Sequence, residues 1–102
     1  MPKYLFEARY TAEGAKGLVN DGGSGRRAAV EKAIASDGGR MEGFYFAFGD
    51  VDAYVIADLP DNVAASAIAL AVAQSGRASV KTVALMSPEE IGKEAAKNAA
   101  RM

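Results

Sequence analysis

The segment MEGFYFAF, residues 41–48, precedes the pair Gly49-Asp50 and a second run that suits a strand, Asp52–Leu59. Aromatic and β-branched residues favour strands, and a Gly-Asp pair between two such runs is typical of a tight turn. The sequence therefore predicts a β-hairpin whose strands cover residues 40–48 and 52–59.

The residues before this hairpin predict one strand and a broken helix. Residues 3–10 place tyrosine, phenylalanine and alanine at every second position, which is the pattern of a strand with two different faces. A helix over residues 11–20 begins with a threonine N-cap, and a second helical segment covers 26–36. The glycine-rich residues 21–25 interrupt the helix between these segments, and Gly38-Gly39 ends it.

The residues after the hairpin predict a helix, a strand and a final helix. Pro60-Asp61 stops the second hairpin strand and caps a helix over residues 62–74, and a fourth strand follows over 79–86. The sequence Ser-Pro-Glu-Glu at 87–90 combines an N-cap, a first-turn proline and the glutamate of a capping box. It predicts an extra C-terminal helix over residues 88–101.

The resulting order is β-α-β-β-α-β with an additional helix. This order is typical of an α+β, ferredoxin-like fold, in which a four-stranded antiparallel sheet carries its helices on one face. No linker or internal repeat divides the chain, so we expect a single domain over residues 1–102 with its core in 3–86.

The composition excludes several function classes. The 102 residues contain no cysteine and no histidine, which excludes disulfides, thiolate sites and catalysis through histidine. A net charge of −1 argues against nucleic acid as a partner. The start of the chain lacks the pattern of a signal peptide and no apolar run reaches the length of a membrane span, so we expect a soluble cytoplasmic protein without membrane or metal partners.

The first hairpin strand is apolar on both faces. Phe44, Phe46 and Phe48 share one face in a regular strand, while Met41, Tyr45 and Ala47 share the other. A sheet with one solvated face would alternate between apolar and polar residues. The second face therefore needs a cover, and we expect a homodimer through the sheet face. The alternative is a monomer in which loops and the last helix cover it.

Short motifs along almost the whole chain, from Tyr4 to Ile91, resemble one known family. They are Tyr10-Thr11 with Glu13-Gly14, Gly38-Gly39, Phe48-Gly49 with Asp52, Pro60-Asp61, Lys81-Thr82 with Leu85, and the helix start Ser87-x-Glu89-Glu90. With these motifs the chain resembles the GYD domain family, which implies a dimeric α/β barrel of ferredoxin-like subunits. The family motif Gly-x-Tyr-Asp reads Gly49-Asp50-Val51-Asp52 here, so a valine replaces its tyrosine.

Three side chains are candidates for proton transfer. Glu7 shares one face of the first strand with Arg9, and we expect this face to be the open one. Glu7 would act there as a base beside a ligand held by Arg9, or the two would form an ion pair. Asp52 suits either proton transfer or local hydrogen bonding at the turn. Tyr45 would polarise a carbonyl group or belong to the core.

Further residues are candidates for ligand binding. Arg26 and Arg27 open a helical segment after the glycines, where an anion is favoured, or they are solvated. The hydroxyls of Tyr10 and Tyr54 and of Thr82 would line a pocket, or would only need partners within the core.

Two functions fit these residues best. The first is a homodimeric module, without a cofactor, that binds or senses a small anionic or apolar ligand. The second is a cofactor-independent enzyme, similar to the monooxygenases and isomerases that share the implied fold, which would use a carboxylate or a tyrosine for proton transfer. A third hypothesis is an assembly role for the exposed helix over residues 89–101.

Overall fold

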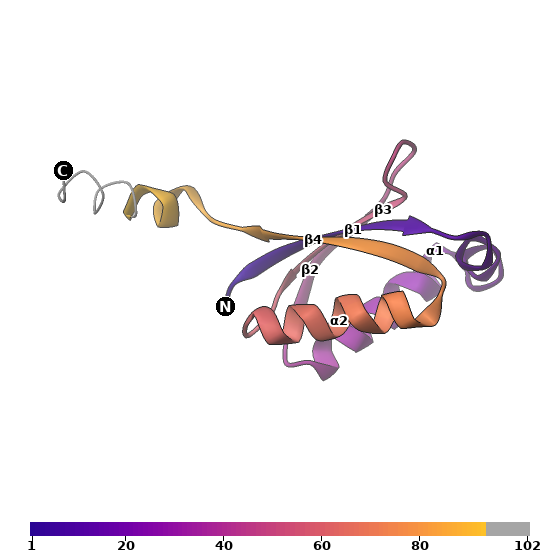
Figure 1. Cartoon of the computed structure of the whole chain (residues 1–102), viewed down its shortest axis with the longest axis horizontal. Helices are drawn as coiled ribbons and strands as arrows, with labels where there is room; N and C mark the ends of the chain where they lie inside the picture. Colours follow the sequence, from indigo (N-terminus) through magenta and orange to yellow (C-terminus); the bar gives the residue numbers. More distant parts are fainter. Residues whose placement is uncertain (94–102) are drawn as a thin grey trace.

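The computed structural model describes residues 1–93 and shows one four-stranded sheet with two helices against one of its faces (Figure 1). The elements are, in chain order, β1 (Lys3–Tyr10), α1 (Ala12–Ser36), β2 (Arg40–Phe46), β3 (Ala53–Asp58), α2 (Asn62–Ser75) and β4 (Ala78–Leu85). The strands lie in the order β2-β3-β1-β4, and all neighbours are antiparallel. The predicted ferredoxin-like fold is confirmed, with β1 and β3 in the centre of the sheet.

The hydrophobic core lies between this sheet and the helices. Tyr4 and Phe6 of β1 are buried there, as the alternation in this strand predicts. The Tyr4 hydroxyl donates to Asn62 Oδ1 at 2.5 Å, so the one polar end of that side chain has a partner at the start of α2. Ile34 of α1 and Leu59 after β3 are the largest fully buried side chains.

The helix α1 bends at a single residue. Gly22 has φ 75° and ψ 165°, while the helix continues on both sides of it. A positive φ costs little for glycine and about 1–2 kcal/mol for a residue with a Cβ. The break predicted within residues 21–25 is confirmed and is confined to this position. It lets the second half of α1 lie against the sheet, while the first half lies beyond the strand ends (Figure 1).

The strand β2 is shorter than predicted. It ends at Phe46, and Phe48 is fully exposed in the loop to β3, which rises on the side of the sheet opposite the helices (Figure 1). The backbone pairing holds this loop in place, because Ala47 N donates to Asp52 O at 2.9 Å. The prediction that Phe48 belongs to a strand face is therefore wrong.

The same strand contains an irregularity. Its register against β3 shifts between Met41 and Gly43, so that Met41 lies opposite Ala57 and Phe44 lies opposite Val55. Both side chains pack against the core. The prediction that Met41 lies on the face opposite Phe44 is wrong, because an extra residue in a strand reverses the alternation beyond it.

The start of α1 is fastened to the segment before β4. Thr11 Oγ1 accepts a hydrogen bond from Gly14 N at 3.1 Å, and Thr11 N donates to Arg77 O at 2.9 Å. Gly14 comes so close to this segment that a Cβ added to it would stand 1.9 Å from Arg77 O. This close approach gives a physical reason for glycine at position 14.

The starts of the later helices follow the predicted capping. Asp61 Oδ1 accepts from Ala64 N at 2.9 Å at the start of α2. Ser87 and Glu90 form the reciprocal hydrogen bonds of a capping box, with Glu90 N donating to Ser87 Oγ at 3.1 Å and Ser87 N donating to Glu90 Oε1 at 3.0 Å. The bond from the Ser87 backbone is the main reason that the pKa of Glu90 lies below its usual value.

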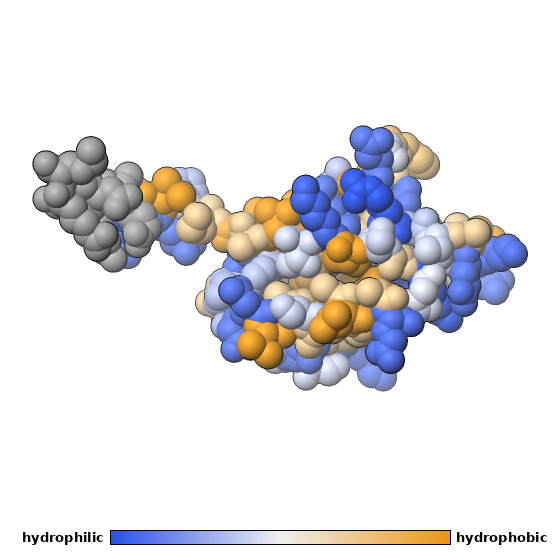
Figure 2. Space-filling view, in the orientation of Figure 1, coloured by the Kyte–Doolittle hydropathy of each residue, from blue (hydrophilic) through white to orange (hydrophobic). Residues whose placement is uncertain are grey.

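The helix that this capping box starts projects away from the sheet (Figure 1). It is described from residue 88 to residue 93, and the rest of the predicted helix over 88–101 lies outside the described residues. The helix α2 contains no charged residue, and its outer side exposes Val63 and Leu70 as apolar patches (Figure 2). None of the helices in the described part of the chain is long and apolar enough to span a membrane.

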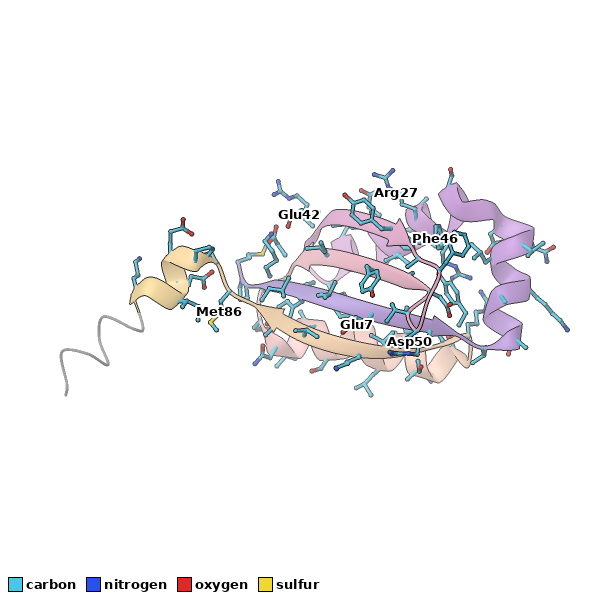
Figure 3. The ribbon with its side chains drawn as sticks, turned by 90° about the horizontal axis from the view of Figure 1, so that it is seen from above. Glu7, Arg27, Glu42, Phe46, Asp50 and Met86 are labelled. Carbon is cyan, nitrogen blue, oxygen red and sulfur yellow. The ribbon has the colours of Figure 1, made fainter. Side chains whose placement is uncertain are left out.

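The second face of the sheet has no cover within residues 1–93. Leu5 lies between Ile56 and Val83 in the centre of this face, and all three side chains are half-buried. Tyr54 lies opposite Tyr45, which is 65% exposed. We call this surface, formed by the outward side chains of the four strands, the open face (Figure 3).

The open face also carries charges of both signs. Glu7 lies next to Leu5 on the same side of β1, opposite Lys81 of β4 (Figure 3). At the start of β1, Lys3 Nζ pairs with Glu42 and with Asp58, the latter at 2.9 Å. The bond from Lys3 holds the pKa of Asp58 below its usual value. The charges thus surround an apolar centre.

We predict that Gly14→Ala lowers the free energy of unfolding by about 2 kcal/mol or more, because the new Cβ would overlap a backbone carbonyl rather than a flexible side chain. Gly49→Ala is the control, since nothing lies within 4 Å of a Cβ at that position. Urea unfolding followed by circular dichroism measures both variants. Equal stability of the two would contradict the close packing of α1 on the β4 segment.

Candidate functional site

A cavity of about 90 Å³ lies between the sheet and the two helices. Phe6, Val55 and Val80 of the sheet form its floor, and Val30 of α1 and Val72 of α2 close it from the helix side. Its wall is apolar apart from three side chains, those of Tyr10, Arg26 and Arg77. Small-molecule sites in proteins have this composition, an apolar wall with a few polar groups that orient the ligand.

Arg26 reaches the cavity because of the bend in α1. It lies in the first turn after Gly22, and its side chain is only 15% exposed. A Cβ at Gly17 would stand 3.4 Å from Arg26 Nη2, so the guanidinium also lies against the first half of the helix. The glycines of α1 therefore provide both the bend and the room for this side chain.

The guanidinium of Arg26 is incompletely paired. Nε and Nη2 are buried, and neither has a hydrogen-bond partner among the described residues. The carboxylate nearest to it is that of Asp21, whose Oδ2 lies 3.8 Å from Nη2, beyond hydrogen-bond distance. Leaving a buried donor without a partner costs about 1–3 kcal/mol, and more for a charged group. This arginine is thus held in a position that is unfavourable for the folded protein alone.

Tyr10 lines the same cavity from the end of β1. Burial raises the pKa of its hydroxyl, the charge of Arg26 opposes this shift, and the carboxylate of Asp52 adds to it. Tyr10 is therefore protonated at neutral pH and offers a hydrogen-bond donor. Asp52 Oδ2 itself accepts from Tyr10 N at 2.8 Å, so its carboxylate secures the end of β1 against the hairpin loop.

Four predicted site residues lie on the open face and not at the cavity. Glu7 and Arg9 belong to the outward side of β1, and Tyr45 and Tyr54 form a cross-strand pair on β2 and β3. Glu7 is half-buried between Tyr54 and Lys81, whereas Arg9 is exposed. The sheet separates these side chains from the cavity.

Two further predicted residues also lie apart from it. Arg27 is exposed on α1, next to the half-buried Arg26. Thr82 faces the helix side of β4, where it borders a separate surface hollow with Tyr4 and Asn62. Among residues 1–93, no three carboxylate side chains come together as a possible metal site.

The structure thus brings together two of the predicted ligand-binding residues, Tyr10 and Arg26, and adds one that the sequence analysis missed. Arg77 follows the glycine that ends α2 and borders the cavity where β4 begins. Its sequence position resembles that of any solvated arginine in a turn, so no signal in the sequence distinguishes it. The sequence predicts the apolar residues of the wall as core residues. It does not show that they line a cavity, because core and cavity residues follow the same alternation.

Comparison with protein-family models matches residues 4–95 to the GYD domain. Neither the curated proteins nor the solved structures contain a match to the chain. Position 51, where valine replaces the tyrosine of the family motif, is 5% exposed, so its side chain is part of the protein interior.

We predict that Arg26→Met leaves the free energy of unfolding unchanged or raises it by about 1 kcal/mol. Methionine preserves the length of the side chain and removes two buried donors that lack partners. Arg27→Met, at an exposed position, is the matched control and should change stability by less than about 0.5 kcal/mol. Thermal and urea unfolding give the comparison. A loss above about 1 kcal/mol in Arg26→Met alone would mean that Arg26 is a structural residue.

Proposed function

The chain belongs to the GYD domain family, and we propose that it is a homodimeric module that binds one small ligand in each protomer, between the sheet and the helices. The observation that carries this proposal is the pair of buried guanidinium nitrogens without partners in Arg26, a residue that lines an apolar cavity. Buried polar groups without partners are rare in folded proteins, and each needs an explanation. A ligand that supplies the missing acceptors explains this one.

The size of the cavity bounds the ligand. An apolar cavity of about 150 Å³ admits a benzene ring. A cavity of about 90 Å³ therefore suits the apolar part of a smaller molecule, such as a short branched chain. Its walls come from the sheet and from the two helices, so a ligand here would contact the central strands and both helices at once.

The dimer part of the proposal is supported by the open face. Its centre is apolar, with Leu5, Ile56 and Val83 half-buried, and Phe48 is fully exposed on the loop that rises beside it (Figures 1 and 3). A two-fold interface places the same surface on both partners, so it must complement itself. Charges of both signs around an apolar centre meet that requirement.

The alternative, a cofactor-independent enzyme, needs a proton acceptor at the cavity. Of the candidates for proton transfer, Glu7 and Tyr45 lie on the other side of the sheet, and the Asp52 carboxylate accepts a backbone hydrogen bond. Tyr10 does line the cavity, but burial raises the pKa of its hydroxyl, which makes it a donor and not a base at neutral pH. These positions support binding ahead of catalysis.

We predict that the protein sediments as a dimer at micromolar concentration and that Val83→Lys converts it to a monomer. The substitution would place a charge in the apolar centre of the open face, where the partner would have to bury it. Val63→Lys, on the exposed side of α2, is the matched control and should remain dimeric. Analytical ultracentrifugation measures the oligomeric state of the unmodified protein and of both variants. A monomeric unmodified protein would contradict the dimer.

We further predict that small organic molecules bind in the cavity and that Val72→Phe prevents it by filling the space. The probes are 3-methylbutanoate and its neutral amide, 3-methylbutanamide, titrated into ¹⁵N-labelled protein. Amide signals of residues around the cavity should shift in the unmodified chain and in the control Leu70→Phe, which changes the outer side of the same helix. If neither probe shifts these signals, the binding function proposed here is wrong.

A further inference from the structure

Building on the proposed binding function, we infer that the ligand is a monocarboxylate with a short branched apolar body, and that its carboxylate forms a two-pronged contact with Arg26. The chemical class of the ligand follows from the identity of the two unpaired atoms, from their surroundings and from the charge available at the site.

The two buried atoms without partners are Nε and Nη2. In the planar guanidinium these nitrogens donate from the same edge, and their N–H bonds are nearly parallel. Two parallel donors match the two oxygens of a carboxylate, which is the geometry of the strongest arginine–carboxylate contacts. A single carbonyl or hydroxyl oxygen would satisfy this edge less completely.

The surroundings of Arg26 favour an acceptor from outside the chain. Asp21 is the carboxylate that approaches Nη2, but it does so at 3.8 Å, and its own side chain is 51% exposed to water. A solvated carboxylate at this distance lowers the cost of burying the charge of Arg26 without taking up its donors. The edge formed by Nε and Nη2 thus keeps its donors unpaired, but both atoms are enclosed by the protein, so the guanidinium has to turn toward the cavity that its side chain lines before a carboxylate can reach them.

The charge at the site favours a carboxylate over a phosphate group. A phosphate monoester carries about −1.5 to −2 charges at neutral pH and three acceptor oxygens. Arg26 is the half-buried cation at the cavity, since Arg77 borders the same space but is exposed. One positive charge balances one carboxylate, and the neutral Tyr10 hydroxyl supplies one further donor.

The rest of the cavity determines the body of the ligand. Its wall consists of valine, isoleucine, phenylalanine and alanine side chains apart from the three polar ones, so a polar or charged body would be left without partners. The volume of about 90 Å³ suits a few carbon atoms. A short branched aliphatic acid meets all of these conditions.

The experiment compares 3-methylbutanoate with 3-methylbutanamide, which has almost the same shape and no charge. Titrations of ¹⁵N-labelled protein at pH 7 should show that the carboxylate binds at least tenfold more tightly to the unmodified chain. Arg26→Met should remove this preference, because the variant lacks the paired donors and should bind the carboxylate no more tightly than the amide. Arg27→Met, at the neighbouring exposed position, should keep the preference in full.

Two further measurements test the preference for a carboxylate: the Arg26→Lys variant and competition by inorganic phosphate. Arg26→Lys retains the charge but not the paired donors, so it should restore only part of the preference for the carboxylate. Inorganic phosphate at the same concentration should not displace 3-methylbutanoate. Displacement by phosphate would overturn the assignment to carboxylates.

Failure of this inference differs from failure of the proposed function. If both probes bind with equal affinity, or if Arg26→Met keeps the preference, the cavity binds ligands but Arg26 does not select a carboxylate, and the inference is wrong. If neither probe binds, the binding function itself is wrong. The comparison of the two probes on the unmodified chain does not depend on any variant folding correctly.

Discussion

The bend at Gly22 is the constraint on which the helix layer and the candidate site both depend. A straight helix of the length of α1 would run past the sheet, whereas the positive φ of this residue turns the second half back against the sheet, where it contacts β2. Arg26 lies in the first turn after this bend. Its side chain therefore points inward, lies against Gly17 in the first half of the helix and lines the cavity. One backbone conformation that glycine adopts at little cost thus determines both the covering of the core and the position of the half-buried Arg26.

Arg26 differs from the residues that stabilise this fold. The caps at Thr11, Asp61 and Ser87 and the packing of Tyr4 and Phe6 satisfy their polar groups and fill space. Two nitrogens of Arg26 have no hydrogen-bond partner, and the cavity that its side chain lines is left unfilled. Proteins tolerate such costs where a site must remain ready for a ligand, because stability beyond what folding requires is not selected.

The order of elements and the helix starts were predictable because each depends on neighbouring residues. The N-cap of α2 and the capping box at Ser87 and Glu90 are examples, as is the break near Gly22. The bulge next to Met41 was not predictable, since it depends on pairing with β3. Sequence alone also could not separate Arg26 from Arg27, because the bend that buries one and exposes the other is a property of the packed helix.

The alternation of side chains along β1 has a consequence for how this protein family can change over time. Phe6, Ala8 and Tyr10 line the cavity, while Leu5, Glu7 and Arg9 between them belong to the open face. Point mutations at one set leave the other in place, so the preference for a ligand and the surface for association are free to diverge separately. An insertion of one residue would exchange the two sets, and we expect lineages to accept length changes in the exposed hairpin loop instead.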